Sequence, residues 1–320
     1  NYSASGYFFG RELERELNVA IGLIDISYGG ATIFTFMDEI TVVNTLDTAT
    51  FNGTQRQRWE AYQTRIANWE DQGRKGRRPP FPPQHFSSLC YNAMVHPIVP
   101  FANRGAIWYQ GESDVAHPDA YVSWFGDYIA MMRAKFDNAE MPFYFVQLAG
   151  FVNQPNTNVP PETWAKFRIA QEQCLKHPNT GMATAMDIGM KENIHPKNKQ
   201  EVGRRLALCA LKQTYGKKEI VCNGPQLKSI EKRGRTLLLT FDHWEGRLKN
   251  REEGNYVQGF SAVLRNGDRI DLEGKITSGN TVEIKASDIQ RLRYAFANYP
   301  VCSLYNGEGL PALPFDRNVK

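Results

Sequence analysis

The spacing of the hydrophobic residues changes once along the chain, near residue 217, and this change limits what the sequence can fold into. Before it, short β-branched or aromatic runs alternate with longer stretches of helical periodicity, which is typical of a layered α/β domain. After it, short runs of strand character occur at 236–241, 260–264 and 281–284, and Asn266-Gly267 is a hairpin turn signal. We therefore predict an α/β domain over residues 1–216 and a small β domain over residues 217–320.

Within the first domain, the spacing predicts individual elements. A first helix is indicated by Phe9, Leu13 and Leu17, which recur at i, i+4 and i+8 before Asn18, an acceptable helix stop. Two more apolar stripes lie at helical spacing in residues 59–69 and 121–136, and we interpret both as core packing. The strand candidates are residues 19–26, 106–109, 143–148 and 182–188.

The charge balance argues against nucleic acid as a partner. The chain has 38 basic and 34 acidic residues, a net charge of +4, far from the basic excess that neutralises many phosphates. One segment, residues 73–83, concentrates Arg and Lys with Pro and Gly, so we predict an exposed, extended connection there. A local nucleic-acid patch is the weaker alternative.

Membrane, disulfide and metal patterns are also missing from the sequence. No run approaches the roughly 18 apolar residues of a membrane helix. The five cysteines are scattered without a Cys-x-x-Cys pair, so we expect buried free thiols. No His and carboxylate cluster has metal-ligand spacing. The chain opens at Asn1 with neither an initiator Met nor a signal peptide, and we expect a segment upstream of it.

Three polar loops, each after a predicted strand, hold the candidate chemistry. Residues 105–114 (GAIWYQGESD) run from a strand straight into a tight turn, and such turns meet ligands in open α/β sheets. Residues 192–196 (ENIHP) follow the strand that ends near Asp187. Residues 27–31 (SYGGA) follow the first strand candidate, and their glycines let backbone N–H groups approach a ligand closely.

His195, in the second loop, could act as a general base toward a hydroxyl nucleophile. Glu192 or Asp187 could then fix its tautomer. A single histidine is more often structural than catalytic, and a Gly-Gly turn by itself is weak evidence. The order of the three loops is the more specific signal.

Taken together, these loops resemble the sialate O-acetylesterase family, a branch of the SGNH (GDSL-like) hydrolases that act on acetylated sugars. The resemblance extends over nearly the whole chain, and further strings support it: residues 7–13 (YFFGREL), 91–97 (YNAMVHP), 195–206 (HPKNKQEVGRRL) and 304–311 (LYNGEGLP). It implies a three-layer α/β/α, flavodoxin-like domain with a parallel sheet, and an acetylated sugar as substrate. It implies no cofactor. Such esterases are commonly exported to periplasm, exterior or lysosome, and we expect the same here.

The resemblance also implies roles for individual residues. His195 would take the proton of a serine nucleophile and then protonate the departing sugar hydroxyl. Backbone N–H groups at Gly29 or Gly30 and the side chain of Gln110 would hold the oxyanion. Glu112 would order its loop or bind substrate rather than transfer protons.

Two departures from the family pattern matter. The family nucleophile sits in a Gly-Gln-Ser-Asn string upstream of the Gly-Gly turn, and no such string occurs in the 320 residues. We therefore expect the serine and the first strand to lie upstream, and the chain alone to be inactive. Many relatives also have Asp where this chain has Asn193, so the acid partner of His195 is Glu192, Asp187 or a backbone carbonyl.

Two other readings remain open at this stage. Ser113 follows a strand in a Gly-Glu-Ser string that mimics the Gly-Asp-Ser nucleophile string, but the family places its nucleophile earlier. The missing serine would also fit a carbohydrate-binding or scaffolding protein without catalysis. The sequence does not choose between sialic acid and plant polysaccharides such as xylan or xyloglucan as the acetylated sugar.

Overall fold

The computed structural model describes residues 2–152 and 162–319. By its internal contacts the chain divides into two compact units, which we describe separately. The first unit comprises residues 1–23, 106–109 and 142–320, and the second comprises residues 24–105 and 110–141. The predicted domain boundary at residue 217 lies inside the first unit, between a helix ending at Gln213 and a strand beginning at Gln226.

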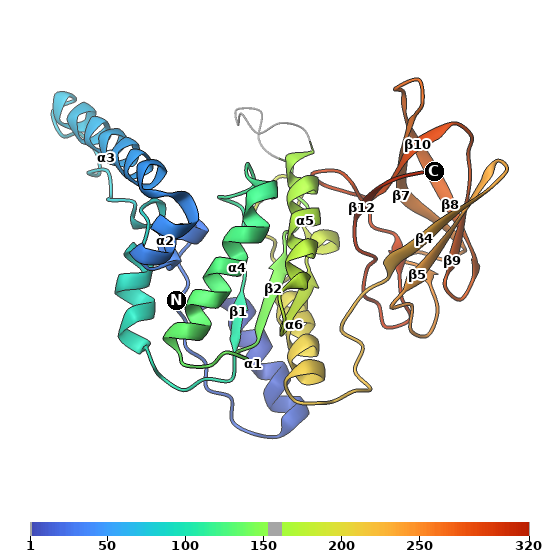
Figure 1. Cartoon of the computed structure of the whole chain (residues 1–320), viewed down its shortest axis with the longest axis horizontal. Coiled ribbons are helices and arrows are strands. Elements are labelled where there is room, and N and C mark those ends of the chain that lie inside the picture. Colours follow the sequence, from blue (N-terminus) through green and yellow to red (C-terminus); the bar gives the residue numbers. More distant parts are fainter. Residues whose placement is uncertain (1, 153–161, 320) are drawn as a thin grey trace. The chain divides into compact units, whose positions relative to one another are not determined.

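A parallel sheet of three strands lies at the centre of the α/β part of the first unit (Figure 1). Its order is β1 (Ala106–Trp108), β2 (Phe143–Gln147) and β3 (Thr180–Thr184). Three helices of the same unit accompany it: α1 (Ala4–Leu17), α5 (Thr163–Gln173) and α6 (Lys199–Gln213). The predicted strands at 106–109 and 143–148 are confirmed, and the one at 182–188 begins two residues earlier and ends at Thr184.

Alternate residues of β2 point to different helices, as a pleated strand requires. Tyr144 and Val146 pack with Leu13 of α1 and Leu206 of α6 in one hydrophobic cluster. Gln147, which points the other way, donates its side-chain N–H to the carbonyl of Arg168 in α5 at 2.9 Å. The sheet thus has helices on both faces, and the predicted layered α/β class is confirmed.

Residues 19–26, predicted as a buried strand, do not form one. Val19 and Ile24 are about half exposed, and no strand of the described residues pairs with this segment. Apolar β-branched residues favour a strand only where a neighbouring strand supplies hydrogen bonds and a packing surface. The helix predicted before this segment is confirmed: α1 ends at Leu17, and its C-cap Asn18 has a left-handed φ of 53° that closes the last turn.

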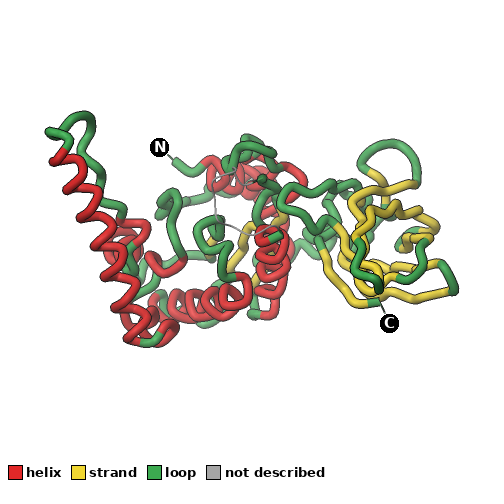
Figure 2. Tube along the Cα trace, turned by 90° about the horizontal axis from the view of Figure 1, so that it is seen from above, coloured by secondary structure: helices red, strands yellow, loops and turns green. Residues whose placement is uncertain are grey.

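The C-terminal part of the first unit is antiparallel. Seven strands form one sheet in the order β12-β10-β7-β8-β9-β5-β4, and β11 pairs with β6. The strands are β4 (Gln226–Arg233), β5 (Thr236–Asp242), β6 (Lys249–Asn250), β7 (Tyr256–Leu264), β8 (Arg269–Ser278), β9 (Thr281–Lys285), β10 (Ile289–Tyr294), β11 (Leu304–Tyr305) and β12 (Phe315–Asn318). Figure 2 shows these strands gathered at the C-terminal end of the chain. The predicted β domain is confirmed, including the turn at Asn266-Gly267 between β7 and β8.

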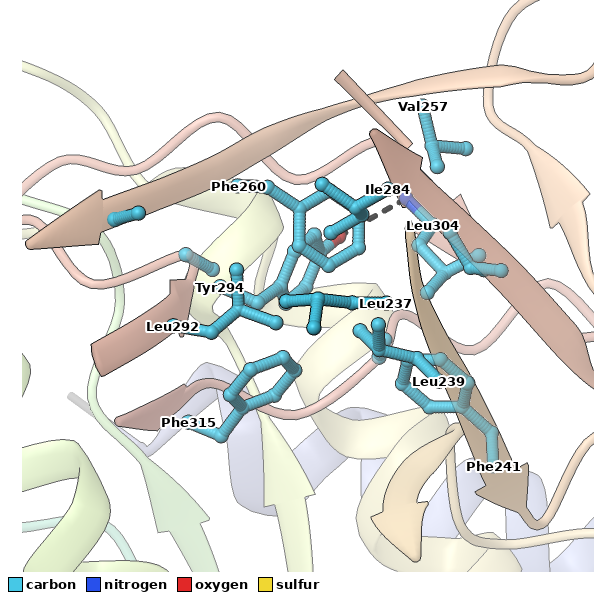
Figure 3. Close-up of a cluster of buried hydrophobic side chains, with 14 of the residues drawn as sticks. Leu237, Leu239, Phe241, Val257, Phe260, Ile284, Leu292, Tyr294, Leu304 and Phe315 are labelled. Carbon is cyan, nitrogen blue, oxygen red and sulfur yellow. Dashed lines mark hydrogen bonds between the residues drawn. The ribbon is translucent and has the colours of Figure 1, made fainter. Parts of the chain in front are cut away.

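The antiparallel sheet has its own hydrophobic core, drawn in Figure 3. In β5 the buried residues are Leu237, Leu239 and Phe241, so every second side chain enters the core. The phenol oxygen of the fully buried Tyr294 accepts a hydrogen bond from the backbone N–H of Leu304 at 3.0 Å. This bond satisfies the one polar atom of a side chain that otherwise packs against apolar residues.

The second unit is mainly helical. It contains α2 (Glu39–Leu46), α3 (Thr48–Asp71) and α4 (Pro118–Lys135). The stripe predicted in residues 121–136 is confirmed as core, because Tyr121, Phe125, Tyr128, Ile129 and Met132 of α4 are buried. The segment predicted to be exposed, residues 73–83, contains no buried residue.

The stripe in residues 59–69 lies on a helix, but our interpretation of it as core is wrong. None of the 24 residues of α3 is buried, and Trp59 is 50% exposed. Its rings contact one another and a loop instead: the Trp59 and Tyr62 ring centres are 5.9 Å apart, and those of Tyr62 and Phe81 are 5.3 Å apart. The helical spacing of the apolar residues correctly predicted a helix. It does not show whether other parts of the protein cover the apolar side of that helix.

Other features of the described residues agree with the sequence. All five cysteines are buried and free, as expected: Cys90, Cys174, Cys209, Cys222 and Cys302. No helix of the described part of the chain is long and apolar enough to cross a membrane.

Helices α1 and α6 approach each other most closely at Gly203. A Cβ atom at this position would lie 2.6 Å from the Cβ of Phe8 and 2.6 Å from the backbone N of Phe9. Both distances are shorter than van der Waals contact, and the second involves backbone that cannot rotate away. The absence of a side chain at Gly203 therefore sets the spacing of the two helices.

We predict that Gly203→Ala lowers the free energy of unfolding by about 1–2 kcal/mol, because the overlap with α1 outweighs the better helix propensity of Ala. Gly53→Ala in α3 is the matched control, since nothing lies within 4 Å of its added Cβ. We expect that variant to be stabilised by about 0.5–1 kcal/mol. Urea denaturation followed by circular dichroism measures both, and equal shifts in the two variants would contradict the packing argument.

Candidate functional site

The loop that carries His195 is held at both ends by side-chain hydrogen bonds. The side-chain oxygen of Asn193 accepts the backbone N–H of His195 at 2.9 Å, which forms a local turn. Three residues after His195, Asn198 caps α6 by accepting the backbone N–H of Glu201 at 3.1 Å. Asn193, which departs from the family pattern, thus shapes this loop through an oxygen that an aspartate would also supply.

The His195 imidazole is exposed to solvent, and so is the side chain of Glu192. Neither side chain has a hydrogen-bond partner among the described residues. The imidazole is therefore available to an incoming group, and no hydrogen bond from the described part of the chain fixes its tautomer.

The carboxylate of Asp187 makes its hydrogen bonds to residues other than His195. Its two carboxylate oxygens accept hydrogen bonds from Arg205 of α6 at 2.6 and 2.9 Å, and one also accepts from the Tyr305 hydroxyl at 3.0 Å. Burial disfavours the charged form of Arg205, but the hydrogen bonds and the charge of Asp187 outweigh this and raise the pKa of Arg205 above its ordinary value. Arg205 also contacts Glu201 at 2.8 Å. Asp187 thus belongs to a clamp between the end of β3, α6 and β11, and makes no hydrogen bond to His195.

In the second unit, the glycine loop and the 110–114 turn are fastened together. The carbonyl of Gly30 accepts a hydrogen bond from the Ser113 hydroxyl at 2.9 Å, and the carbonyl of Ala31 accepts one from Gln110 at 2.9 Å. Gly30 has a φ of +69°, a conformation that favours glycine. A Cβ at Gly29 or Gly30 would meet nothing within 4 Å, so this side of the loop is open.

The side chain of Gln110 is buried and its amide hydrogens are both used. One goes to the carbonyl of Ala31, and the other to the carboxylate of Asp114 at 2.6 Å. Its amide oxygen accepts from the Tyr121 hydroxyl at 2.9 Å. In this arrangement Gln110 positions the glycine loop, and one of its two N–H bonds would have to be exchanged before it could donate to an oxyanion. Glu112 lies partly exposed in the same turn.

Asp114, the last residue of this turn, was not among the candidate site residues predicted from the sequence. It is 3% exposed, and one of its oxygens accepts from both Gln110 and the backbone N–H of Ile33, the latter at 2.8 Å. Burial raises the pKa of Asp114, while these hydrogen bonds and the charges of His117 and Arg58 oppose the rise. The sequence shows a carboxylate four residues after Gln110. It does not show that this carboxylate accepts a hydrogen bond from Ile33, which lies 81 residues away in the chain.

We predict that Asp114→Asn becomes more stable relative to the wild type as pH rises. A raised native pKa contributes stability that is present below the ordinary pKa and is lost as pH rises through the raised one. The asparagine keeps an oxygen for Gln110 and Ile33 but cannot ionise. Melting temperatures measured from pH about 4 to about 8 test this. Asp137→Asn, on an exposed turn, is the control for loss of a carboxylate. A difference between Asp114→Asn and wild type that does not change with pH would contradict the prediction.

Comparisons with known proteins agree on one family. The family model described as "Carbohydrate esterase, sialic acid-specific acetylesterase" matches residues 3–212. A sialate O-acetylesterase of Rattus norvegicus is 28% identical over 99% of this chain and 64% of its own length. A sialate O-acetylesterase of Homo sapiens is also 28% identical, over 98% of this chain and 60% of its own length. The chain thus spans about three-fifths of the length of these curated relatives.

A solved structure is similar over the same range. A carbohydrate acetylesterase from Xanthomonas citri superposes with a TM-score of 0.79 at 29% identity, covering 99% of this chain and 65% of its own. The family model covers well over half of the chain, including the Gly29-Gly30 loop, Gln110 and His195. This chain therefore belongs to the sialic acid-specific acetylesterase family of carbohydrate esterases.

Proposed function

We propose that the protein hydrolyses O-acetyl esters of sugars by a serine-esterase mechanism in which His195 is the general base. The observation that carries this proposal is the family match over residues 3–212, which includes the candidate site residues. The family match supports the esterase class, and the serine mechanism and the residue roles are the finer part of the same proposal.

His195 would remove the proton from a serine hydroxyl as that oxygen attacks the acetyl carbonyl. It would then give the proton to the sugar oxygen as the ester bond breaks, which leaves the acetyl group on the serine. Water attacks this acyl-enzyme in the same way, and acetate leaves. The exposed imidazole of His195, without a protein hydrogen bond among the described residues, supports this role.

We assign the orientation of His195 to Glu192 rather than to Asp187. Glu192 stands three residues before the histidine and is free of hydrogen bonds among the described residues. Asp187 is held by Arg205 and Tyr305. A carboxylate with two buried partners would have to give up one of them to reach an imidazole.

We assign the oxyanion contacts to backbone N–H groups at Gly29 and Gly30. The open space beside both glycines and the two hydrogen bonds that fasten the loop support this assignment. A preorganised donor of this kind contributes on the order of 3 kcal/mol to the transition state. Gln110 contributes by holding Ala31, or directly after exchanging one bond.

The nucleophile we expect is a serine outside the 320 residues, because the family string Gly-Gln-Ser-Asn does not occur in them. Ser113 is a poor candidate, since its hydroxyl donates to the carbonyl of Gly30 rather than to a base. On this view the isolated chain is inactive. We also propose that the protein is exported and acts on acetylated sialic acid or on acetylated plant-type polysaccharides.

We predict that His195→Ala in the complete protein lowers kcat for an acetylated sugar by at least about 10³-fold, because both proton transfers are lost. Lys197→Ala, an exposed substitution in the same loop, is the control and should keep wild-type activity. Release of acetate is the measurement. Unchanged turnover in His195→Ala would remove this residue from the mechanism.

We predict that a fluorophosphonate labels the complete protein on a serine outside these 320 residues, because only an activated serine reacts. Peptide mass spectrometry locates the adduct. An adduct on Ser113 would overturn our assignment of the nucleophile. Absence of any adduct, combined with saccharide binding, would favour the alternative of a carbohydrate-binding protein without catalysis.

A further inference from the structure

Two of the five buried cysteines lie next to each other. Cys209 is on α6, and Cys222 is on the segment that leads from α6 to β4. Both belong to one cluster of buried hydrophobic residues, and their thiols lie within hydrogen-bond range of each other. The Sγ atom of Cys209 also lies 3.9 Å from the carbonyl oxygen of Met182, a residue that lines a small cavity together with Cys222. Packing, hydrogen bonding and a shared neighbour thus place the two thiols together.

The other three cysteines have different surroundings. The thiol of Cys174 donates to the carbonyl of Ala170, and that of Cys302 donates to the carbonyl of Pro300. Cys90 lies in the second unit. Among the described residues, no cysteine is in contact with any of these three thiols or influences its pKa. The described part of the chain therefore brings two thiols together at one place.

The surroundings also make the two thiols differ in reactivity. A hydrogen bond from Cys209 lowers the pKa of the Cys222 thiol, and the charge of Lys212 acts in the same direction while burial opposes both. The contact with Cys222, together with burial, raises the pKa of Cys209. Cys222 lines the cavity, which has a volume of about 40 Å³, so there is space beside this residue. Because the thiolate is the attacking form in disulfide exchange, Cys222 is the thiol that reacts first.

We propose that Cys209 and Cys222 form a modification site, at which a disulfide oxidant such as oxidised glutathione joins the two sulfur atoms. The Cys222 thiolate attacks one sulfur of the oxidant, and one glutathione leaves as its thiolate. Cys209 then loses its proton and attacks the Cys222 sulfur of this mixed disulfide, which releases the second glutathione. The two protein thiols are oxidised, the disulfide of the oxidant is reduced, and the two protons end on the released glutathiones.

The bond links the last part of α6 to the segment before β4 and closes a loop of about 13 residues. Cys209 lies one helical turn after Arg205, the partner of Asp187, so the link is adjacent to that clamp. Disulfides form and persist in oxidising compartments. The bond therefore belongs to an exported form of the protein, whether or not the proposed esterase function is correct.

The test incubates the reduced, folded complete protein with an excess of oxidised glutathione. Urea just below the unfolding transition lets buried thiols open transiently. The reaction is stopped with acid, and free thiols are then alkylated. Trypsin separates the two cysteines, because Lys212, Lys217 and Lys218 lie between them.

We expect mass spectrometry to find residues 206–212 linked to residues 219–228, with the loss of two hydrogens. Dithiothreitol should reverse the link, and the other three cysteines should be recovered unlinked. Recovery of both peptides only in the alkylated form, or a different pairing of the five cysteines, would overturn the proposal.

A second measurement compares the melting temperatures of the oxidised and reduced forms. Oxidation should raise the melting temperature of the wild type by roughly 5 °C, because the closed loop restricts the unfolded chain. Cys222→Ser should lose this rise. Cys302→Ser, which removes a similarly buried thiol outside the pair, is the matched control and should keep it.

Each protein is compared with its own reduced form, so destabilisation by the serine itself does not affect the result. The same rise in Cys222→Ser would show that the link is not responsible. An equal or lower melting temperature of the oxidised wild type would show that the native structure does not accommodate the bond. Either result would overturn the proposal.

Discussion

The bidentate ion pair between Asp187 and Arg205 supports the arrangement of the first unit. It joins the end of β3 to α6, and Tyr305 adds β11 of the antiparallel part to the same carboxylate. Both charges are buried, so removing one partner would leave an uncompensated charge inside the protein. The His195 loop connects Asp187 to α6, and the clamp therefore fixes both ends of the segment that carries the imidazole. Arg168, fully buried in α5, binds the carbonyls of Ala297 and Asn298 and adds a second link to the C-terminal part.

In the second unit, a buried carboxylate likewise organises the hydrogen bonds around the glycine loop. Buried Asp114 accepts hydrogen bonds from Gln110 and Ile33, and Gln110 and Ser113 hold the carbonyls of Ala31 and Gly30. These bonds orient the peptide groups that follow Gly30 and Ala31, and they fasten the end of the glycine loop to the 110–114 turn.

Much of the fold could be predicted, because hydrophobic period is a local property. The layered α/β class, the strands at 106–109 and 143–148, helix α1 and the antiparallel C-terminal part all follow from it. The same reasoning was wrong at residues 19–26, which have no strand beside them, and at the stripe on α3, which is not buried. Both errors concern the part of the protein that would pack against the element. A local sequence pattern carries no information about whether such a packing surface exists.

By itself, the sequence determined that an α/β part precedes an antiparallel part, the free state of the cysteines and the family, because these depend on nearby residues or on strings of fixed spacing. Only the tertiary structure decided the use of each polar group. It paired Asp187 with Arg205 and Tyr305, and it directed the two amide hydrogens of Gln110 to Ala31 and Asp114. Each of these results depends on contacts between residues far apart in the chain. Burial makes such contacts decisive, since a polar group removed from water must find its partner within the protein or in a ligand.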